Sequence, residues 1–209
     1  MRLTLVRHGE TDHNRGQLTL GRADVPLNEL GRLQARALAG SFTQAPTAIY
    51  SSPLVRTFET ARAISAATGV DVVVEPDLTE MDVGEMEHLT RTELRDQFPE
   101  FVRAWLSAEA GEARMPGGET LAEVQERAWL AIERMRAAHP AGEVVAVAHN
   151  FVILTVVCRS LNLPLSEFRR LRHGLASRTV IDMVDGGATL IHLNDDAHLL
   201  AAGLAGGPT

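Results

Sequence analysis

Short apolar runs alternate along this chain with segments of helical periodicity, and no other feature restricts the fold as strongly. Such an order is typical of a largely parallel sheet with helices on both faces. We therefore expect an α/β fold, a three-layer αβα sandwich whose sheet is mostly parallel with one antiparallel edge strand. The last two runs flank Asp185-Gly186-Gly187-Ala188, and Asp-Gly is a strong hairpin signal. Strands are expected at 3–6, 47–50, 70–74, 143–148, 177–184 and 189–193, and helices at 11–15, 27–41, 53–67, 90–98, 99–110, 119–139 and 151–161.

The length of 209 residues fits one domain, which we expect at residues 1–200. Residues 85–118 are charged and helical in pattern, and they are expected to form an excursion over the sheet near the active site. The tail at 201–209 is rich in small residues, Gly and Pro, so it is expected to be flexible.

Lysine is absent, and all 20 basic residues are arginines. A Schiff-base lysine, a P-loop lysine and a Ser-Lys dyad are therefore excluded. The net charge of −7 argues against nucleic acid as a partner but permits a small phosphorylated substrate. Cys158 stands alone, so no intramolecular disulfide and no cysteine metal cluster can form. We find no secretory signal and no apolar run that could span a bilayer, and we expect a cytoplasmic protein without membrane contact.

The first apolar run ends abruptly in Arg7-His8-Gly9, and Thr11 then offers a helix cap. His8 is thereby placed at the carboxyl end of a strand, where open α/β sheets bind their ligands. An imidazole at this position can act as a base, a metal ligand or a nucleophile. The neighbouring Arg7 favours an anionic substrate over a metal, because a fixed cation repels a second cation.

The run at 144–148 leads into His149-Asn150 in the same manner, so two histidines are expected at the same edge of the sheet. A third strand precedes Ser52-Pro53, which suit an N-cap and the first helical position. Arg56 then falls in the first helical turn, beside free N–H groups and the positive end of the helix dipole. This combination favours a phosphate site, although a surface arginine over a helix start is the simpler interpretation of Arg56 alone.

Taken together, these residues resemble the histidine phosphatase superfamily, the phosphoglycerate mutase-like or RHG family. The matching residues follow the family's order and cover most of the chain, from residue 3 to about 150. They are Arg7-His8-Gly9, Asn14, Gly21 with Asp24-Val25-Pro26-Leu27, Ser51-Ser52-Pro53 with Arg56 and Thr60-Ala61, Glu80 with Gly84, Pro116-Gly117-Gly118-Glu119-Thr120, and Ala148-His149. The resemblance implies a phosphoglycerate mutase-like fold.

The resemblance also implies the roles of the central residues. His8 would attack phosphorus and form a phosphohistidine, while Arg7, Arg56 and His149 would hold the phosphoryl oxygens. Glu80 would be the general acid. Apolar neighbours after it could raise its pKa. Two further carboxylates, Glu85 and Glu87, are the alternatives for this role.

Four more positions are candidates for phosphate or substrate binding. Asn14 would contact the phosphate through its amide, or serve as an ordinary turn residue. Gly21 begins the Gly-x-x-Asp-x-Pro-Leu segment of the family. Leu20, directly before it, stands where many family members carry a polar residue. Asn150 stands where many carry glycine. The apolar Leu20 favours a leaving group less polar than phosphoglycerate, whereas Glu119 or Thr120 is expected to cap a helix.

The expected function is metal-independent hydrolysis of small phosphomonoesters through a phosphohistidine, with no cofactor and no metal site. One alternative is a cofactor-dependent phosphoglycerate mutase, which would need a more complete lid to exclude water. Another is a phosphate-binding module without catalysis. A homodimer could form through the edge strand at 189–193, although sheet edges are often simply covered.

Overall fold

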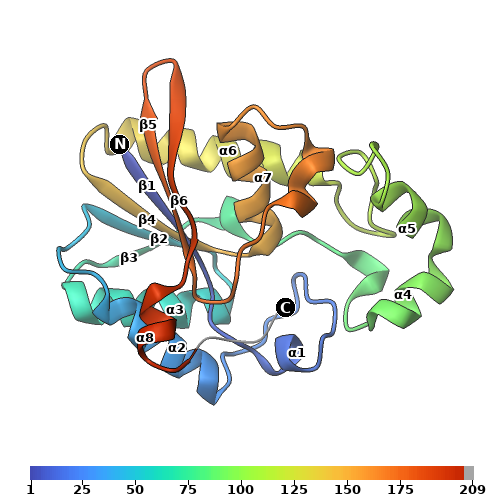
Figure 1. Cartoon of the computed structure of the whole chain (residues 1–209), viewed down its shortest axis with the longest axis horizontal. Helices are drawn as coiled ribbons and strands as arrows, with labels where there is room; N and C mark the ends of the chain where they lie inside the picture. Colours follow the sequence, from blue (N-terminus) through green and yellow to red (C-terminus); the bar gives the residue numbers. More distant parts are fainter. Residues whose placement is uncertain (205–209) are drawn as a thin grey trace.

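The computed structural model describes residues 1–204, which form a six-stranded sheet between two layers of helices (Figure 1). The strand order is β3-β2-β4-β1-β5-β6. The strands are β1 (Arg2–Arg7), β2 (Ala48–Ser51), β3 (Val72–Val74), β4 (Glu143–Ala148), β5 (Arg178–Val184) and β6 (Gly187–Asp195). The first four pair in parallel, β5 pairs antiparallel with β1, and β6 pairs antiparallel with β5. The expected fold class and the final hairpin are therefore confirmed.

Helices cover both faces of the sheet. The α-helices are α1 (Asp12–Arg15), α2 (Glu29–Gly40), α3 (Val55–Thr68), α4 (Arg91–Gln97), α5 (Pro99–Trp105), α6 (Leu121–Ala138), α7 (Asn150–Ser160) and α8 (Ala197–Ala201). Three 3-10 helices are η1 (Pro76–Leu78), η2 (Gly84–Met86) and η3 (Leu165–Arg170). In β4, Val144 and Ala146 join the core with α6 and α7, whereas Val145 and Val147 join the core with α2 and α3. Burial on both faces explains why this strand is apolar from Val144 to Ala148.

The strand register brings the two histidines together. Arg7 of β1 pairs with Ala148 of β4, so His8 and His149 leave the sheet at the same level. The amide of His8 donates to Ala148 O, which continues the ladder one residue beyond the strand. The site therefore lies at the carboxyl ends of adjacent parallel strands, as expected.

Some element boundaries differ from the expectation. The helix expected from Pro53 begins at Val55, because the side chain of Asp24 rather than Ser52 accepts the Val55 amide, at 2.7 Å. The helix expected to reach Ala110 ends at Trp105. Just beyond it, Ser107 Oγ donates to Ala104 O and accepts the Glu109 amide, which replaces helical bonding with a turn. The short α8 was not expected from the sequence.

The excursion between η2 and α6 carries α4 and α5, which project to one side of the sheet (Figure 1). Its apolar anchor is Trp105, whose ring packs edge-on against Phe151 of α7 and Phe168 of η3. The centroid separations are 5.7 and 5.1 Å. Aromatic contacts of this kind attach the excursion to the helices beside the site.

In the sheet of the described residues, β6 is an edge strand that pairs with β5, and Ile191 on it is 40% exposed. Pairing of this edge across a homodimer stays a prediction. Within residues 1–204, no helix combines the length and the apolarity needed to cross a membrane. Of the expected tail, Leu204 donates its amide to Leu199 O, and residues 205–209 lie outside the described part of the chain.

Candidate active site

A cleft of about 620 Å³ opens at the carboxyl ends of the strands. It brings together six of the predicted site residues: Arg7, His8, Asn14, Leu20, Glu80 and Asn150. Three others, Arg56, His149 and Gly21, are buried beside it and are not part of its lining. The remaining lining residues are Gln17, Leu18, Thr19, Arg91, Phe151, Leu154, Phe168, Arg169, Leu171, Arg172 and His173.

The rings of His8 and His149 meet edge to face, with their centroids 5.3 Å apart. His8 Nδ1 lies 2.7 Å from Gly9 O, which can only accept, so this nitrogen carries the proton. His8 Nε2 is then the nitrogen with the free lone pair. His149 Nε2 bonds to Ser52 Oγ at 2.8 Å. Ser52 was predicted as a helix cap, and the structure instead uses its hydroxyl to orient the second histidine.

Both predicted arginines are held by backbone carbonyls, and Arg56 is fully buried whereas Arg7 is half-buried. Arg7 Nη1 donates to His173 O at 2.6 Å. Arg56 is 0% exposed, and its two terminal nitrogens donate to Gly21 O at 2.7 Å and Ala23 O at 2.8 Å. The role of Gly21 in the fold is thus to offer its carbonyl to Arg56. These bonds fix the direction of each guanidinium fork.

Glu87 also holds the loop at residues 21–23, whose carbonyls accept from Arg56. Its carboxylate accepts the amides of Gly21, Arg22 and Ala23 at 2.7 to 3.2 Å. Neither Glu87 nor Glu85 lines the cleft, whereas Glu80 does. The predicted acid and its two alternatives therefore occupy different environments.

Three buried nitrogens around His8 have no hydrogen-bond partner within residues 1–204: Arg7 Nε, Arg56 Nε and His149 Nδ1. An unpaired buried donor is costly, on the order of 1–3 kcal/mol. Two of these nitrogens are guanidinium donors, and the third belongs to an imidazole. Their chemistry fits an anion with several acceptor oxygens.

Burial, and then the charges of Arg56 and Arg7, hold the pKa of His8 well below its usual value. The pKa of His149 is also well below its usual value, chiefly because of burial and Arg56. Burial lowers the pKa of Arg7 to about 10, which leaves it charged at neutral pH. The site therefore combines permanent guanidinium charge with a neutral His8 imidazole.

Glu80 is 4% exposed, and burial raises the pKa of its carboxyl. Its Oε1 accepts the Met81 amide at 2.8 Å, and its Oε2 accepts the Phe151 amide at 3.4 Å. Met81 and Val83, two of the apolar residues that follow it, are fully buried. A carboxyl of this kind keeps its proton to higher pH than an exposed one.

Asn14, a predicted phosphate-binding residue, has a local hydrogen-bond partner. Asn14 Oδ1 accepts the Thr11 amide at 3.1 Å, and Thr11 Oγ1 accepts the Asn14 amide at 3.2 Å, so the two form a capping box. Asn14 thus combines the turn role with a place on the cleft wall. His88 bonds to His13 at 3.0 Å and is not part of the cleft lining.

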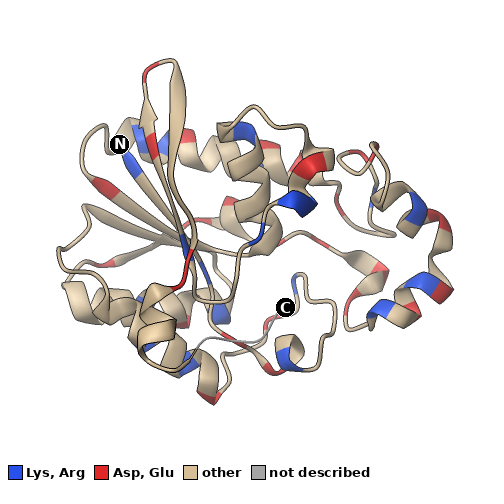
Figure 2. Ribbon diagram, in the orientation of Figure 1, with Lys and Arg blue, Asp and Glu red and all other residues tan. Residues whose placement is uncertain are grey.

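The outer cleft is basic on one side and apolar on another. Arg91 begins α4, Arg169 lies in η3, and Arg172 follows η3. Arginines are blue in Figure 2. Within residues 1–204, none of the three forms an ion pair with a carboxylate. Four apolar side chains complete the lining beside them: Phe151, Leu154, Phe168 and Leu171. The cleft thus carries more positive charge than the residues around His8 supply.

Comparison with known proteins identifies the family of this chain. The family model of the histidine phosphatase superfamily (branch 1) matches residues 3–196. Phosphoserine phosphatase 1 of Hydrogenobacter thermophilus is 34% identical over 200 residues, which are 95% of this chain and 94% of that protein. A probable phosphoglycerate mutase of Enterobacter sp. is 34% identical over 183 residues, 87% of this chain and 85% of its own.

Among solved structures, a mycobacterial glucosyl-3-phosphoglycerate phosphatase in complex with VO3 superposes with a TM-score of 0.85. It is 32% identical, and the match covers 93% of this chain and 99% of that chain. The chain therefore belongs to the histidine phosphatase superfamily, and its relatives include both phosphatases and phosphoglycerate mutase-like proteins.

Proposed function

We propose that this protein is a phosphomonoesterase that transfers the phosphoryl group of a small ester to His8 and then to water, without a metal or cofactor. The observation that carries the proposal is the edge-to-face pair of His8 and His149, whose centroids are 5.3 Å apart, beside the half-buried Arg7 and the fully buried Arg56. A neutral imidazole beside fixed positive charge is the arrangement that nucleophilic attack on a phosphoryl dianion needs.

In the first step, the lone pair of His8 Nε2 forms the N–P bond while the ester P–O bond breaks. The electron pair of the broken bond stays on the leaving oxygen, which takes the proton of Glu80. In the second step, the Glu80 carboxylate accepts a proton from water as the water oxygen bonds to phosphorus. The N–P bond then breaks, and its electron pair returns to Nε2.

The positive charge that stabilises both steps would come from Arg7, Arg56 and His149. The unpaired nitrogens Arg7 Nε, Arg56 Nε and His149 Nδ1 support this assignment, because phosphoryl oxygens could accept from all three. A bound dianion would also raise the pKa of His149 against the lowering effects of burial and Arg56. Within residues 1–204, no group of three or more His, Cys, Asp or Glu side chains is arranged to hold a metal. Metal independence itself is tested with a chelator.

The leaving group of the preferred substrate carries a second negative charge. Arg91, Arg169 and Arg172 support this part of the proposal, since they line the cleft without carboxylate partners in the described chain. Phosphoserine and phosphoglycerate, which appear in the names of the relatives, are both carboxylates. Leu20 and the apolar wall would contact the carbon skeleton of such a substrate.

The test is phosphate release, with a chelator present, from pairs of esters that differ by one carboxylate. Suitable pairs are phosphoserine with phosphoethanolamine and 3-phosphoglycerate with glycerol 3-phosphate. The rate for 4-nitrophenyl phosphate measures phosphoryl transfer from a leaving group without a carboxylate. We expect kcat/KM about tenfold or more higher for each carboxylate, as one charged hydrogen bond provides. Replacing Arg91 and Arg172 together by Gln should remove this preference, whereas the exposed Arg62→Gln should not. Equal rates within each pair would contradict the anionic leaving group, and no release from any ester would contradict the phosphatase.

The similarity to a probable phosphoglycerate mutase supports a second candidate function. A mutase must exclude water from the phosphohistidine. Conversion of 3-phosphoglycerate to 2-phosphoglycerate, primed with 2,3-bisphosphoglycerate and faster than phosphate release, would identify the protein as a mutase.

A further inference from the structure

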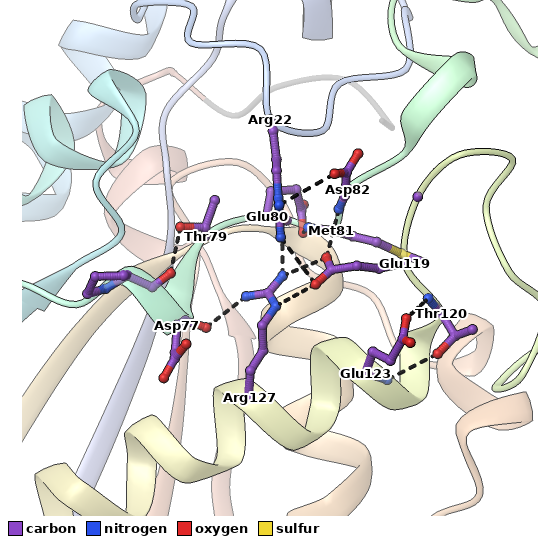
Figure 3. Close-up of polar contacts among 12 residues, drawn as sticks. Arg22, Asp77, Thr79, Glu80, Met81, Asp82, Glu119, Thr120, Glu123 and Arg127 are labelled. Carbon is purple, nitrogen blue, oxygen red and sulfur yellow. Dashed lines mark hydrogen bonds and ion pairs between the residues drawn. The ribbon is translucent and has the colours of Figure 1, made fainter.

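Arg127 extends from α6 toward the segment that carries Glu80 (Figure 3). Its Nη1 donates to Asp77 O at 2.8 Å, and its Nη2 donates to Glu80 O at 3.2 Å. The side chain is 17% exposed and is not part of the cleft lining. Arg127 therefore contacts the main chain of the acid residue from the side away from the substrate.

A carboxylate extends this contact along the segment. Arg127 also donates through Nε and Nη2 to both oxygens of Glu119, at 3.0 Å each. Glu119 Oε2 in turn accepts the Asp82 amide at 2.8 Å, and the Glu119 amide donates to Asp82 O at 2.9 Å. One guanidinium–carboxylate pair thus holds the segment from Asp77 to Asp82 at both of its ends (Figure 3).

The segment depends on these bonds because it has no regular secondary structure between η1 and η2. No strand ladder or helical bond fixes the backbone at Glu80. Next to Glu119, Gly118 packs so closely against the segment that a Cβ there would overlap Asp82 O. The direction of the Glu80 side chain is therefore set by long-range contacts with the start of α6 and the loop before it.

Arg22 also contacts Glu80 O and Glu119, but more weakly than Arg127 does. Its Nε lies 3.5 Å from Glu80 O, and it forms ion pairs with Asp82 at 3.4 Å and Glu119 at 3.2 Å. Its side chain is 45% exposed, so solvent screens these pairs more than the pair of Arg127. Arg127 is consequently the principal support of the segment.

We propose that Arg127 is a positioning residue for Glu80: through Asp77 O, Glu80 O and Glu119 it fixes the backbone from which the acid carboxyl reaches the leaving oxygen. The inference rests on the proposed function, in which Glu80 protonates that oxygen. Arg127 donates in three directions at once, which a lysine ammonium cannot reproduce at this spacing.

The test compares Arg127→Gln with Arg134→Gln on two esters. Arg134 is the matched control, because it lies two turns further along α6 and bonds to the side chains of Glu75 and Asp77 instead of the backbone of the acid. Arg127→Gln should lower kcat/KM for phosphoserine on the order of 10²-fold, the effect of a misplacement of about 1 Å. It should lower kcat/KM for 4-nitrophenyl phosphate only about threefold or less, because this constant reports cleavage of the ester and nitrophenolate leaves without a proton. Arg134→Gln should leave the ratio of the two rates unchanged.

A double-mutant cycle decides whether Arg127 acts through Glu80. In the Glu80→Gln background, Arg127→Gln should cause no further loss, since two residues that act as one unit are not additive. The same fold-loss in both backgrounds, or equal slowing of both esters, would overturn the inference. If Arg127→Gln does not fold by circular dichroism, Glu119→Gln provides the same comparison with a smaller loss. A wild-type protein that releases no phosphate at all would instead reject the proposed function.

Discussion

Replacing Arg56 by Met tests how much of the reaction depends on the buried guanidinium. Methionine keeps an unbranched apolar stem in the space of the fully buried Arg56 side chain. It removes the donors to Gly21 O and Ala23 O, and it removes the Nε group that has no partner within residues 1–204. The substitution therefore separates the charge of the site from its packing.

The structure sets the size of the expected loss in kcat and of the expected loss in stability. Loss of one preorganised donor to a transition-state oxyanion costs on the order of 10²–10³ in kcat. For stability, Gly21 O is buried and loses a charged donor, which costs about 1–3 kcal/mol. Removal of a buried ionised group offsets part of that cost, since burial already lowers the pKa of Arg56. We expect a net loss of about 2 kcal/mol, which leaves the protein folded.

The assay is turnover of 4-nitrophenyl phosphate together with urea unfolding followed by circular dichroism. Arg62→Met is the matched control, because Arg62 lies on the same helix α3 with an exposed side chain. It should change neither turnover nor the unfolding midpoint by more than a small amount. A folded Arg56→Met protein with a kcat within about threefold of wild type would refute the reasoning, because a lost oxyanion donor cannot cost so little.

Three further outcomes follow from the same contacts. Ser52→Ala removes the 2.8 Å bond to His149 and should lower kcat about three- to tenfold, the value of one neutral hydrogen bond, so an unchanged kcat would contradict the orienting role. The pH profile of kcat/KM should rise through the lowered pKa of His8 and fall through the raised pKa of Glu80, and the falling limb should vanish in Glu80→Gln. Burial lowers the pKa of His173 to about 3, so the unfolded chain binds this proton between about pH 3 and 6.5 while the folded chain does not. Stability should therefore fall as the pH drops through that window, and His173→Asn should flatten the slope of unfolding free energy against pH.

The sequence predicts the sheet and its histidines because their signals are local. A run such as Val144–Ala148 of β4 is apolar on both faces, and a histidine directly follows both β4 and β1. The register that joins His8 to His149 then follows from parallel pairing. The apolar runs and the histidines after them can be recognised from residues that are adjacent in the sequence.

The supports of the site could not be predicted, because they join segments far apart in the chain. Ser52 looks like a helix cap, but its hydroxyl bonds to a histidine 97 residues away. Arg127 looks like one more charge on a long helix, and Glu87 like a second candidate acid. Only the packing of loops against α6 and α3 shows what each side chain contacts. A pattern that would have found Ser52 is its position one residue after β2, equivalent to that of His8 after β1.

Trapping the covalent intermediate tests the central claim, that His8 is the phosphoryl acceptor. The protein is mixed with a ³²P-labelled phosphoester and denatured within milliseconds in alkali, which preserves phosphohistidine, and the labelled peptide is then sequenced. We expect label on His8 in the wild type and none in His8→Ala, which should fold but release no phosphate. Label on any other residue, or phosphate release by His8→Ala at a near-normal rate, would contradict it.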